Sequence, residues 1–191
     1  MGTVIRKLQL VAIALLVFGS VSAVFAQYEE ERPSKYGIRA MSFMPMGGKL
    51  QDQSSLWYGA GIDYYLSKDE EERPTRYITL TFLGSGDGRD RSSMNSLTYG
   101  RIKRTPISDS RTRYTAFGAG IYNLKYHDES PGMFGGLIIT DESTFKPGIY
   151  GVYGQEFNDA YFIELRVDLL PEWQDTSWIG VGLTLGTRIS L

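Results

Sequence analysis

Hydrophobic and polar residues alternate along the last part of the chain, residues 180–191. Apolar side chains occupy every second position from Val181 to Leu191, with Thr187 as the exception. Glycine, threonine, arginine or serine occupies each position in between. Because successive side chains of an extended strand point to opposite faces, this pattern predicts a strand with one apolar face and one small or polar face.

Two earlier segments show the same alternation. Within 55–66, the apolar and aromatic set lies opposite a set that contains glycines and Asp63. Within 160–170, one face consists of Tyr161, Ile163, Leu165, Val167 and Leu169, and the other of Phe162, Glu164, Arg166 and Asp168. Both segments therefore predict strands of the same two-faced kind.

Extended segments bounded by turn residues recur along the whole chain, whereas helical periodicity is hard to find. We therefore predict an all-β fold of eight strands. The predicted ranges are 36–46, 55–66, 76–83, 94–103, 113–126, 146–157, 160–170 and 177–191. The shortest predicted connection is Asn158 and Asp159. An apolar run, 133–140, lies inside the longest connection, where a strand extension, a short helix or a further strand pair would each account for it.

The composition of the second face distinguishes a soluble sheet from an inside-out barrel. A face turned toward water would carry longer and more numerous polar groups, whereas glycine saves room in a narrow interior. Membrane barrels place the apolar face toward lipid and the polar face inside, and closure pairs every backbone group, as hydrocarbon requires. The predicted fold is thus an antiparallel up-and-down transmembrane β-barrel of about eight strands.

This prediction assigns residues to two surfaces. A polar network in the lumen is predicted from Asp63, Glu164, Arg166, Asp168 and Arg188. The predicted lipid-facing residues are Leu56, Ile62, Ile163, Leu165, Val167, Val181, Leu183, Leu185 and Ile189. Aromatic residues near the strand ends are predicted to form interfacial girdles, namely Tyr36, Tyr77, Tyr126, Trp173 and Trp178. The pattern leaves the faces of Arg39, Tyr122 and Glu156 open, because their strands alternate less regularly.

The N-terminal residues 1–26 differ from the rest of the chain. Arg6 and Lys7 precede an uncharged, mostly apolar run, 8–25, and small residues come before Gln27. These features predict a secretory signal peptide cleaved after Ala26 and a single β-barrel domain, 27–191. A retained spanning helix is the alternative, since a run of 18 residues reaches the usual length for one.

Composition narrows the chemistry further. The chain has no cysteine, so disulfides and thiolate metal sites are excluded. Its 22 glycines and 13 tyrosines fit β-structure with close backbone contacts. A formal net charge of −2 gives no support for nucleic-acid binding through a basic surface, so we expect no nucleic-acid partner.

Together, the signal peptide, the absence of cysteine, the eight predicted strands and the apolar alternation to the last residue make the chain resemble the small bacterial outer-membrane β-barrels. Examples are the transmembrane domain of OmpA and the OmpX-like barrels. The resemblance implies the outer membrane as location, with membrane lipid, the barrel-assembly machinery and an extracellular partner of the loops as partners. Those barrels usually end on an aromatic residue, whereas this chain ends on Leu191.

Candidate catalytic and metal-binding groups are few. His127 is the only histidine, with Asp128, Glu129 and Ser130 next to it. Consecutive side chains of an extended segment point in opposite directions, so a solvated loop histidine is the preferred interpretation. The glycine-rich stretch 84–92 lacks the residues of a P-loop or an EF-hand. We therefore predict no catalytic residue, no metal site and no cofactor.

The resulting hypothesis is a non-enzymatic, porin-like outer-membrane barrel with a structural, surface-interaction or small-solute-binding role. One alternative is a soluble lipocalin-like barrel, in which Leu183 and Ile163 would line a ligand cavity while Arg166 and Arg188 would face water. A second alternative is an outer-membrane lipid hydrolase that uses His127.

Overall fold

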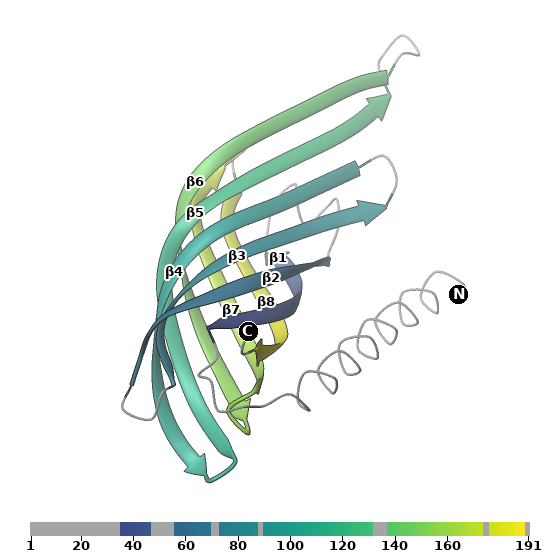
Figure 1. The fold of residues 1–191 in the computed structure, drawn as a ribbon. Helices are drawn as coiled ribbons and strands as arrows, with labels where there is room; N and C mark the ends of the chain where they lie inside the picture. Colours follow the sequence, from purple (N-terminus) through teal and green to yellow (C-terminus); the bar gives the residue numbers. More distant parts are fainter. Residues whose placement is uncertain are drawn as a thin grey trace, which may run out of the picture.

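The computed structural model describes residues 35–46, 56–69, 73–87, 90–131, 137–173 and 176–189. The described residues form eight strands that close into one antiparallel ring in sequence order, which confirms the predicted fold class (Figure 1). The strands are β1 (Tyr36–Met46), β2 (Trp57–Lys68), β3 (Pro74–Asp87), β4 (Asp90–Ser108), β5 (Arg111–Pro131), β6 (Leu137–Phe157), β7 (Tyr161–Trp173) and β8 (Thr176–Ile189). The predicted signal peptide lies outside the described residues.

The register of the ring fixes how steeply the strands tilt. Following paired residues once round the barrel from Tyr36 leads back to β1 at Met46, ten residues further along. With a rise of about 3.3 Å per residue and a strand spacing of about 4.7 Å, this shear tilts the strands by about 40°. One residue along a strand then changes the height on the barrel axis by about 2.5 Å, and one step to the paired neighbour by about 3 Å.

Side chains alternate between the interior and the outer surface. Ile62, Leu165 and Leu183 are about half exposed on the outside, at 54%, 49% and 48%. Asp63 and Arg166 are buried inside, at 0% and 2% exposure. The barrel is therefore apolar outside and charged inside.

The lipocalin-like alternative requires the opposite arrangement and is wrong in this respect. Leu183 and Ile163 lie on the outer surface, whereas Arg166 and Arg188 are buried in the lumen. A cavity lined by these apolar residues is thus not part of the fold.

Large aromatic residues share the interior with the charges, and glycines make room for them. A Cβ atom on Gly180 would lie 1.8 Å from the ring of Phe43, and one on Gly186 would lie 2.1 Å from the ring of Phe162. Real Cβ atoms do not come this close to a neighbour, so the two rings occupy the space that glycine leaves. The glycines of the interior face therefore leave space for aromatic side chains from other strands.

The hairpin of β5 and β6 is longer than predicted. It pairs continuously up to Pro131 and Leu137, so residues 137–140 of the apolar run extend β6, while 133–136 lie outside the described residues. The β6–β7 pairing starts only at Ile149. The first part of β6, residues 137–148, is therefore paired with β5 alone and rises beyond the ring (Figure 1).

The connection between β6 and β7 is a tight turn at the predicted place, and at residues 158–160 it is one residue longer than predicted. Asn158 and Asp159 both have positive φ, 50° and 53°, and the amide of Ala160 donates to the carbonyl of Phe157 at 3.2 Å. Two positive φ values in a row are the signature of a type I′ hairpin turn, which asparagine and aspartate tolerate better than most residues.

The predicted aromatic girdle is only partly present. Tyr77 is buried in the lumen at 2% exposure, so its assignment to the girdle is wrong. Tyr126 packs against an interior cluster. Tyr36 does lie on the outside, where its ring is 5.5 Å from that of Tyr64. The side chains of Trp173 and Trp178 lie outside the described part of the molecule. No described helix has the length and apolar character to cross a membrane.

Candidate functional site: the charged lumen

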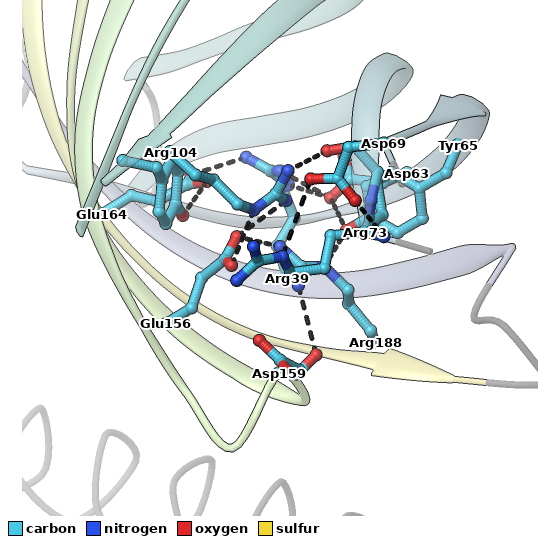
Figure 2. A network of polar contacts seen from close by, with 12 residues as sticks. Arg39, Asp63, Tyr65, Asp69, Arg73, Arg104, Glu156, Asp159, Glu164 and Arg188 are labelled. Carbon is cyan, nitrogen blue, oxygen red and sulfur yellow. Dashed lines mark hydrogen bonds and ion pairs between the residues drawn. The ribbon is translucent and has the colours of Figure 1, made fainter. Parts of the chain in front are cut away.

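Charged side chains from six strands meet inside the barrel in three layers. We call the end of the barrel at the Asn158–Asp159 turn the turn end, and the opposite end, where the β5–β6 hairpin rises, the hairpin end. Figure 2 shows the two layers nearest the turn end.

The first layer crosses the lumen at the turn end. Arg104 of β4 donates from Nε to Glu156 Oε2 at 2.9 Å and from Nη2 to Oε1 at 3.0 Å. Arg188 of β8 donates to the same carboxylate and, from Nη1, to the carbonyl of Asp159 at 3.1 Å. Arg104 also donates to the carbonyl of Pro74. Because β4 and β8 lie on opposite sides of the ring, this layer spans its full width.

The second layer is centred on Arg39 of β1. Its Nη2 lies 2.5 Å from Asp63 Oδ2, and its Nη1 lies 2.9 Å from Glu164 Oε2. Both carboxylates accept further hydrogen bonds, Asp63 from Thr79 at 2.5 Å and from Tyr65 at 3.4 Å, and Glu164 from Tyr114 at 2.6 Å. One arginine thus joins β1 to β2 and β7, and hydroxyl groups satisfy the remaining carboxylate oxygens.

The third layer lies closer to the hairpin end. Arg166 and Asp168, two residues apart on β7, are joined from Nη2 to Oδ1 at 2.8 Å and from Nε to Oδ2 at 2.9 Å. Tyr122 of β5 donates to Asp168 Oδ1 at 2.7 Å. The guanidinium carbon of Arg166 also stands 4.0 Å from the ring centroid of Tyr150, a cation–π contact.

An apolar layer fills the lumen above these charges. It contains Phe43 and Trp57, both at 0% exposure, whose ring centroids are 6.2 Å apart. The full cluster draws residues from β1, β2, β3, β4, β5 and β7, namely Met41, Phe43, Trp57, Leu83, Met94, Tyr122, Leu124 and Leu170.

The three layers balance in charge, with four arginines and four carboxylates. A buried charge without a partner is strongly destabilising, whereas a paired and hydrogen-bonded one is tolerated. The arrangement therefore suits a filled interior. In the described part of the chain, no group of three histidine, aspartate or glutamate residues could hold a metal ion.

The predicted network residues are all buried here, but most of them pair with residues outside the predicted set. Among the described contacts, Arg166 and Asp168 alone form an ion pair within it. Asp63 and Glu164 meet at Arg39, whose face the sequence had left open. Arg104 is a further residue of the network that the alternation did not indicate. Its position has the same parity as Gly100, but the basic run 101–104 places arginine or lysine on both faces and hides that signal.

The residues predicted to face lipid occupy the outer surface to different degrees. Ile62, Ile163, Leu165, Leu183 and Leu185 are exposed, whereas Leu56, Val167, Val181 and Ile189 are of intermediate exposure. Leu56 precedes β2 and does not belong to a strand.

His127 lies on the β5–β6 hairpin, outside the ring. Its Nδ1 is 2.5 Å from Oδ1 of Asp141, the paired residue on β6, and its Nε2 is 3.4 Å from Glu129 Oε1. Hydrogen bonding to Asp141, and then to Glu129, raises the pKa of His127 above its ordinary value of 6.5. Since both ring nitrogens face carboxylates, the histidine is placed to join two strands, and the hydrolase alternative gains no support.

Comparison with known proteins identifies similar folds but no protein of similar sequence. No family model matches the chain, and no curated protein matches it significantly. Among the solved structures that are similar to it, three are compared. The N-terminal β-barrel domain of Pseudomonas aeruginosa OprF has 14% identity over 80% of this chain and 97% of its own, with a TM-score of 0.57. Neisserial surface protein A has 8% identity over 83% and 98%, with a TM-score of 0.50. Ail of Yersinia pestis has 16% identity over 82% and 96%, with a TM-score of 0.49.

The chain therefore has the fold of the small eight-stranded outer-membrane barrels, as its resemblance to the OmpA and OmpX-like proteins implied.

Proposed function

We propose that this chain is a non-enzymatic barrel of a bacterial outer membrane, which anchors the β5–β6 hairpin outside the membrane for contact with a partner. The residues of the outer surface carry the membrane part of this proposal. The filled lumen supports an anchoring role over transport or the binding of a small solute.

The single strongest observation is the height of the apolar outer surface. From the level of Tyr36 to that of Met46 the barrel rises by about 25 Å, which is the height of the apolar band in known membrane barrels. Over this interval the outer surface carries exposed apolar side chains on every strand. The exposed set includes Met44, Ile62, Leu80, Leu97, Phe117, Ile149, Leu165 and Leu183. Water would be a poor solvent for such a surface, whereas lipid is a good one.

The lengths of the connections support one orientation. The turn end carries a two-residue connection at Asp109–Ser110 and a three-residue connection at 158–160, and membrane barrels keep short turns on the periplasmic side. The long β5–β6 hairpin then projects outward from the cell.

The hairpin offers an open edge to a partner. Among the described residues, positions 137–148 of β6 pair with β5 on one side and with no strand on the other, so this segment is an open sheet edge there. Ile139 and Phe145 along this segment are 59% and 69% exposed. An extended segment of another protein could add to this edge as a further strand, with side-chain contacts to these two residues.

The first test is refolding of residues 27–191 in detergent, followed by gel electrophoresis with and without boiling and by far-UV circular dichroism. A β-rich species that migrates differently before boiling supports a closed membrane barrel. A β-rich protein that stays soluble without detergent and shows no shift on boiling contradicts the proposal.

A matched pair of variants tests the apolar band itself. Leu183→Arg places a charge halfway up the band, whereas Ile139→Arg makes the same kind of change on the hairpin outside it. We expect Leu183→Arg to destabilise the barrel in lipid bilayers by about 2 kcal/mol and Ile139→Arg to change its stability little. Equal stability of the two variants in bilayers would mean that the band does not lie in hydrocarbon.

A further inference from the structure

Basic side chains gather on the outer surface of three neighbouring strands near the turn end. The set is Arg76 on β3, Arg101 and Lys103 on β4, and Arg111 and Arg113 on β5, and all five are exposed. We call this set the basic patch. Among the described outward positions of β1, β6, β7 and β8, none carries lysine or arginine, so the patch occupies one side of the barrel.

The register brings these charges close together. Arg76 and Arg101 are paired residues on adjacent strands, and Lys103 follows two positions later on the same face. Thr105 pairs with Arg113, so Lys103 and Arg113 are diagonal neighbours. Like charges directly opposite each other destabilise a sheet. This placement therefore has a cost that a bound anion would offset.

The protein itself supplies little compensation for these charges. In the part of the chain that the structure describes, the ion pairs of arginine belong to the lumen residues and to Arg73, which pairs with Asp69 at 3.6 Å. None of the five basic residues of the patch has such a partner there. One of them, Arg113, has its guanidinium carbon 6.0 Å from the ring centroid of Tyr153.

The position of the patch along the barrel axis indicates which part of the bilayer would surround it. From the register, Arg76, Arg101, Lys103 and Arg113 lie within about 5 Å of the level of Tyr36 on the barrel axis. Outward tyrosines, Tyr36, Tyr64, Tyr153 and Tyr161, lie near the same level, and the outward residues directly above the patch are Ile78, Tyr99 and Phe117. Tyrosine prefers the boundary between hydrocarbon and headgroups. The patch thus sits where the phosphates of a bilayer leaflet would be.

We propose that the basic patch binds the headgroup phosphates of anionic phospholipids in the leaflet at the turn end. The inference rests on the membrane placement proposed above. Guanidinium groups pair with phosphate oxygens through two parallel hydrogen bonds, and the closely spaced cations of the patch suit a lipid that carries a net negative charge. Apolar and aromatic side chains next to the patch receive the acyl chains of the same lipid, which favours a membrane lipid over a water-soluble anion.

The experiment measures which lipids stay with the folded barrel. The protein is reconstituted into vesicles of equal amounts of phosphatidylglycerol and phosphatidylcholine, extracted in a mild detergent and purified, and its retained lipids are counted by mass spectrometry. We expect phosphatidylglycerol to be enriched over phosphatidylcholine by about tenfold, and the enrichment to fall at high salt.

Two variants locate the effect. The variant R76Q/R101Q/K103Q/R113Q removes the four basic residues of the patch that lie within about 5 Å of the level of Tyr36, and it should bring the retained lipids back to the vesicle composition. Lys125→Gln removes an exposed cation of β5 from the opposite end of the barrel and should leave the enrichment unchanged. Lack of enrichment in the parent protein, or full enrichment in the fourfold variant, would overturn the inference.

The same preparations separate failure of this inference from failure of the proposed function. A protein that neither enters the vesicles nor shifts on boiling contradicts the membrane placement itself. A protein that enters them and shifts on boiling, yet retains both lipids equally, contradicts only the lipid site. If glycerol phosphate in solution abolishes the enrichment at the same concentration as the lipid, the patch binds a free anion rather than a membrane lipid.

Discussion

At the scale of single residues, the lumen tolerates buried charge because each ionised group meets a partner of opposite charge, on another strand or, for Arg166 and Asp168, on the same one. Arg39 neutralises two carboxylates that come from strands on either side of it. Glu156 in turn accepts from two arginines. Side chains that would be costly alone are therefore stable together.

Arg166 provides the clearest test of this balance. Arg166→Ala leaves Asp168 buried without its cation, and we expect a loss of about 3 kcal/mol in the free energy of unfolding. The control is Arg101→Ala, which removes an exposed arginine of the outer surface and should change stability by no more than about 0.5 kcal/mol. Denaturant titration of both variants in the same detergent gives the comparison, and equal stability would argue against a structural role for the pair.

Interior and exterior glycines should respond differently to the same substitution. Gly180→Ala puts a Cβ atom into the ring of Phe43, and we expect a loss of about 1–3 kcal/mol. Gly151 has no atom within 4 Å of the place where its Cβ would lie, so Gly151→Ala should be close to neutral. Thermal loss of the unboiled gel band provides the measurement. A lower transition temperature for Gly151→Ala than for Gly180→Ala would contradict the close packing of the Phe43 side chain against Gly180.

At the scale of strands, how well the bounds of a strand can be predicted depends on whether the strand lies in the closed ring. The bounds of β1 agree with the prediction, and β8 starts within one residue of it, because both strands lie in the ring, where inside and outside differ sharply. For the first part of β6 the sequence offers a strand extension only as one of three interpretations of 133–140, since this part pairs on one side only and has no interior to impose a regular alternation. Sequence patterns thus outline the ring but not the hairpin that leaves it.

The pairing of His127 with Asp141 joins the two strands of that hairpin and should depend on pH. Its raised pKa means that the histidine binds a proton more tightly in the folded hairpin than in the unfolded chain. The contact therefore stabilises the hairpin fully below about pH 6.5 and stops doing so as the pH rises through the raised pKa.

Because His127 is the only histidine, its ring can be titrated by NMR without assignment. We expect a pKa above 6.5 in the folded protein and a value closer to 6.5 in Asp141→Asn. Lys125→Gln, two residues away on the same strand, retains Asp141 and is the control for a change of charge. A pKa at or below 6.5 in the parent protein would show that the ring does not pair with Asp141 in solution.

At the scale of the whole molecule, closure and shear combine the strands into a stack of internal layers. The count of eight strands and the inside-out polarity could be predicted, since both depend on the alternation along each strand. The layers could not, because Arg104, Glu156 and Arg188 come from strands that are not neighbours and meet only across the lumen. Contacts across a closed barrel leave no periodic trace in any one strand.

The stack of layers determines whether the barrel conducts. The arginines of the first layer cross the lumen from β8 to β4, the second and third layers follow, and the apolar cluster around Phe43 and Trp57 covers them. Ions would have to pass all four, so opening one should not be enough. We expect no steady current steps in planar lipid bilayers for the parent protein, for Trp57→Ala or for Arg39→Ala. A 16-stranded porin, which has an aqueous channel, is the positive control. Stable single-channel steps from the parent barrel would contradict a filled lumen, whereas steps from Trp57→Ala alone would assign closure to the apolar layer.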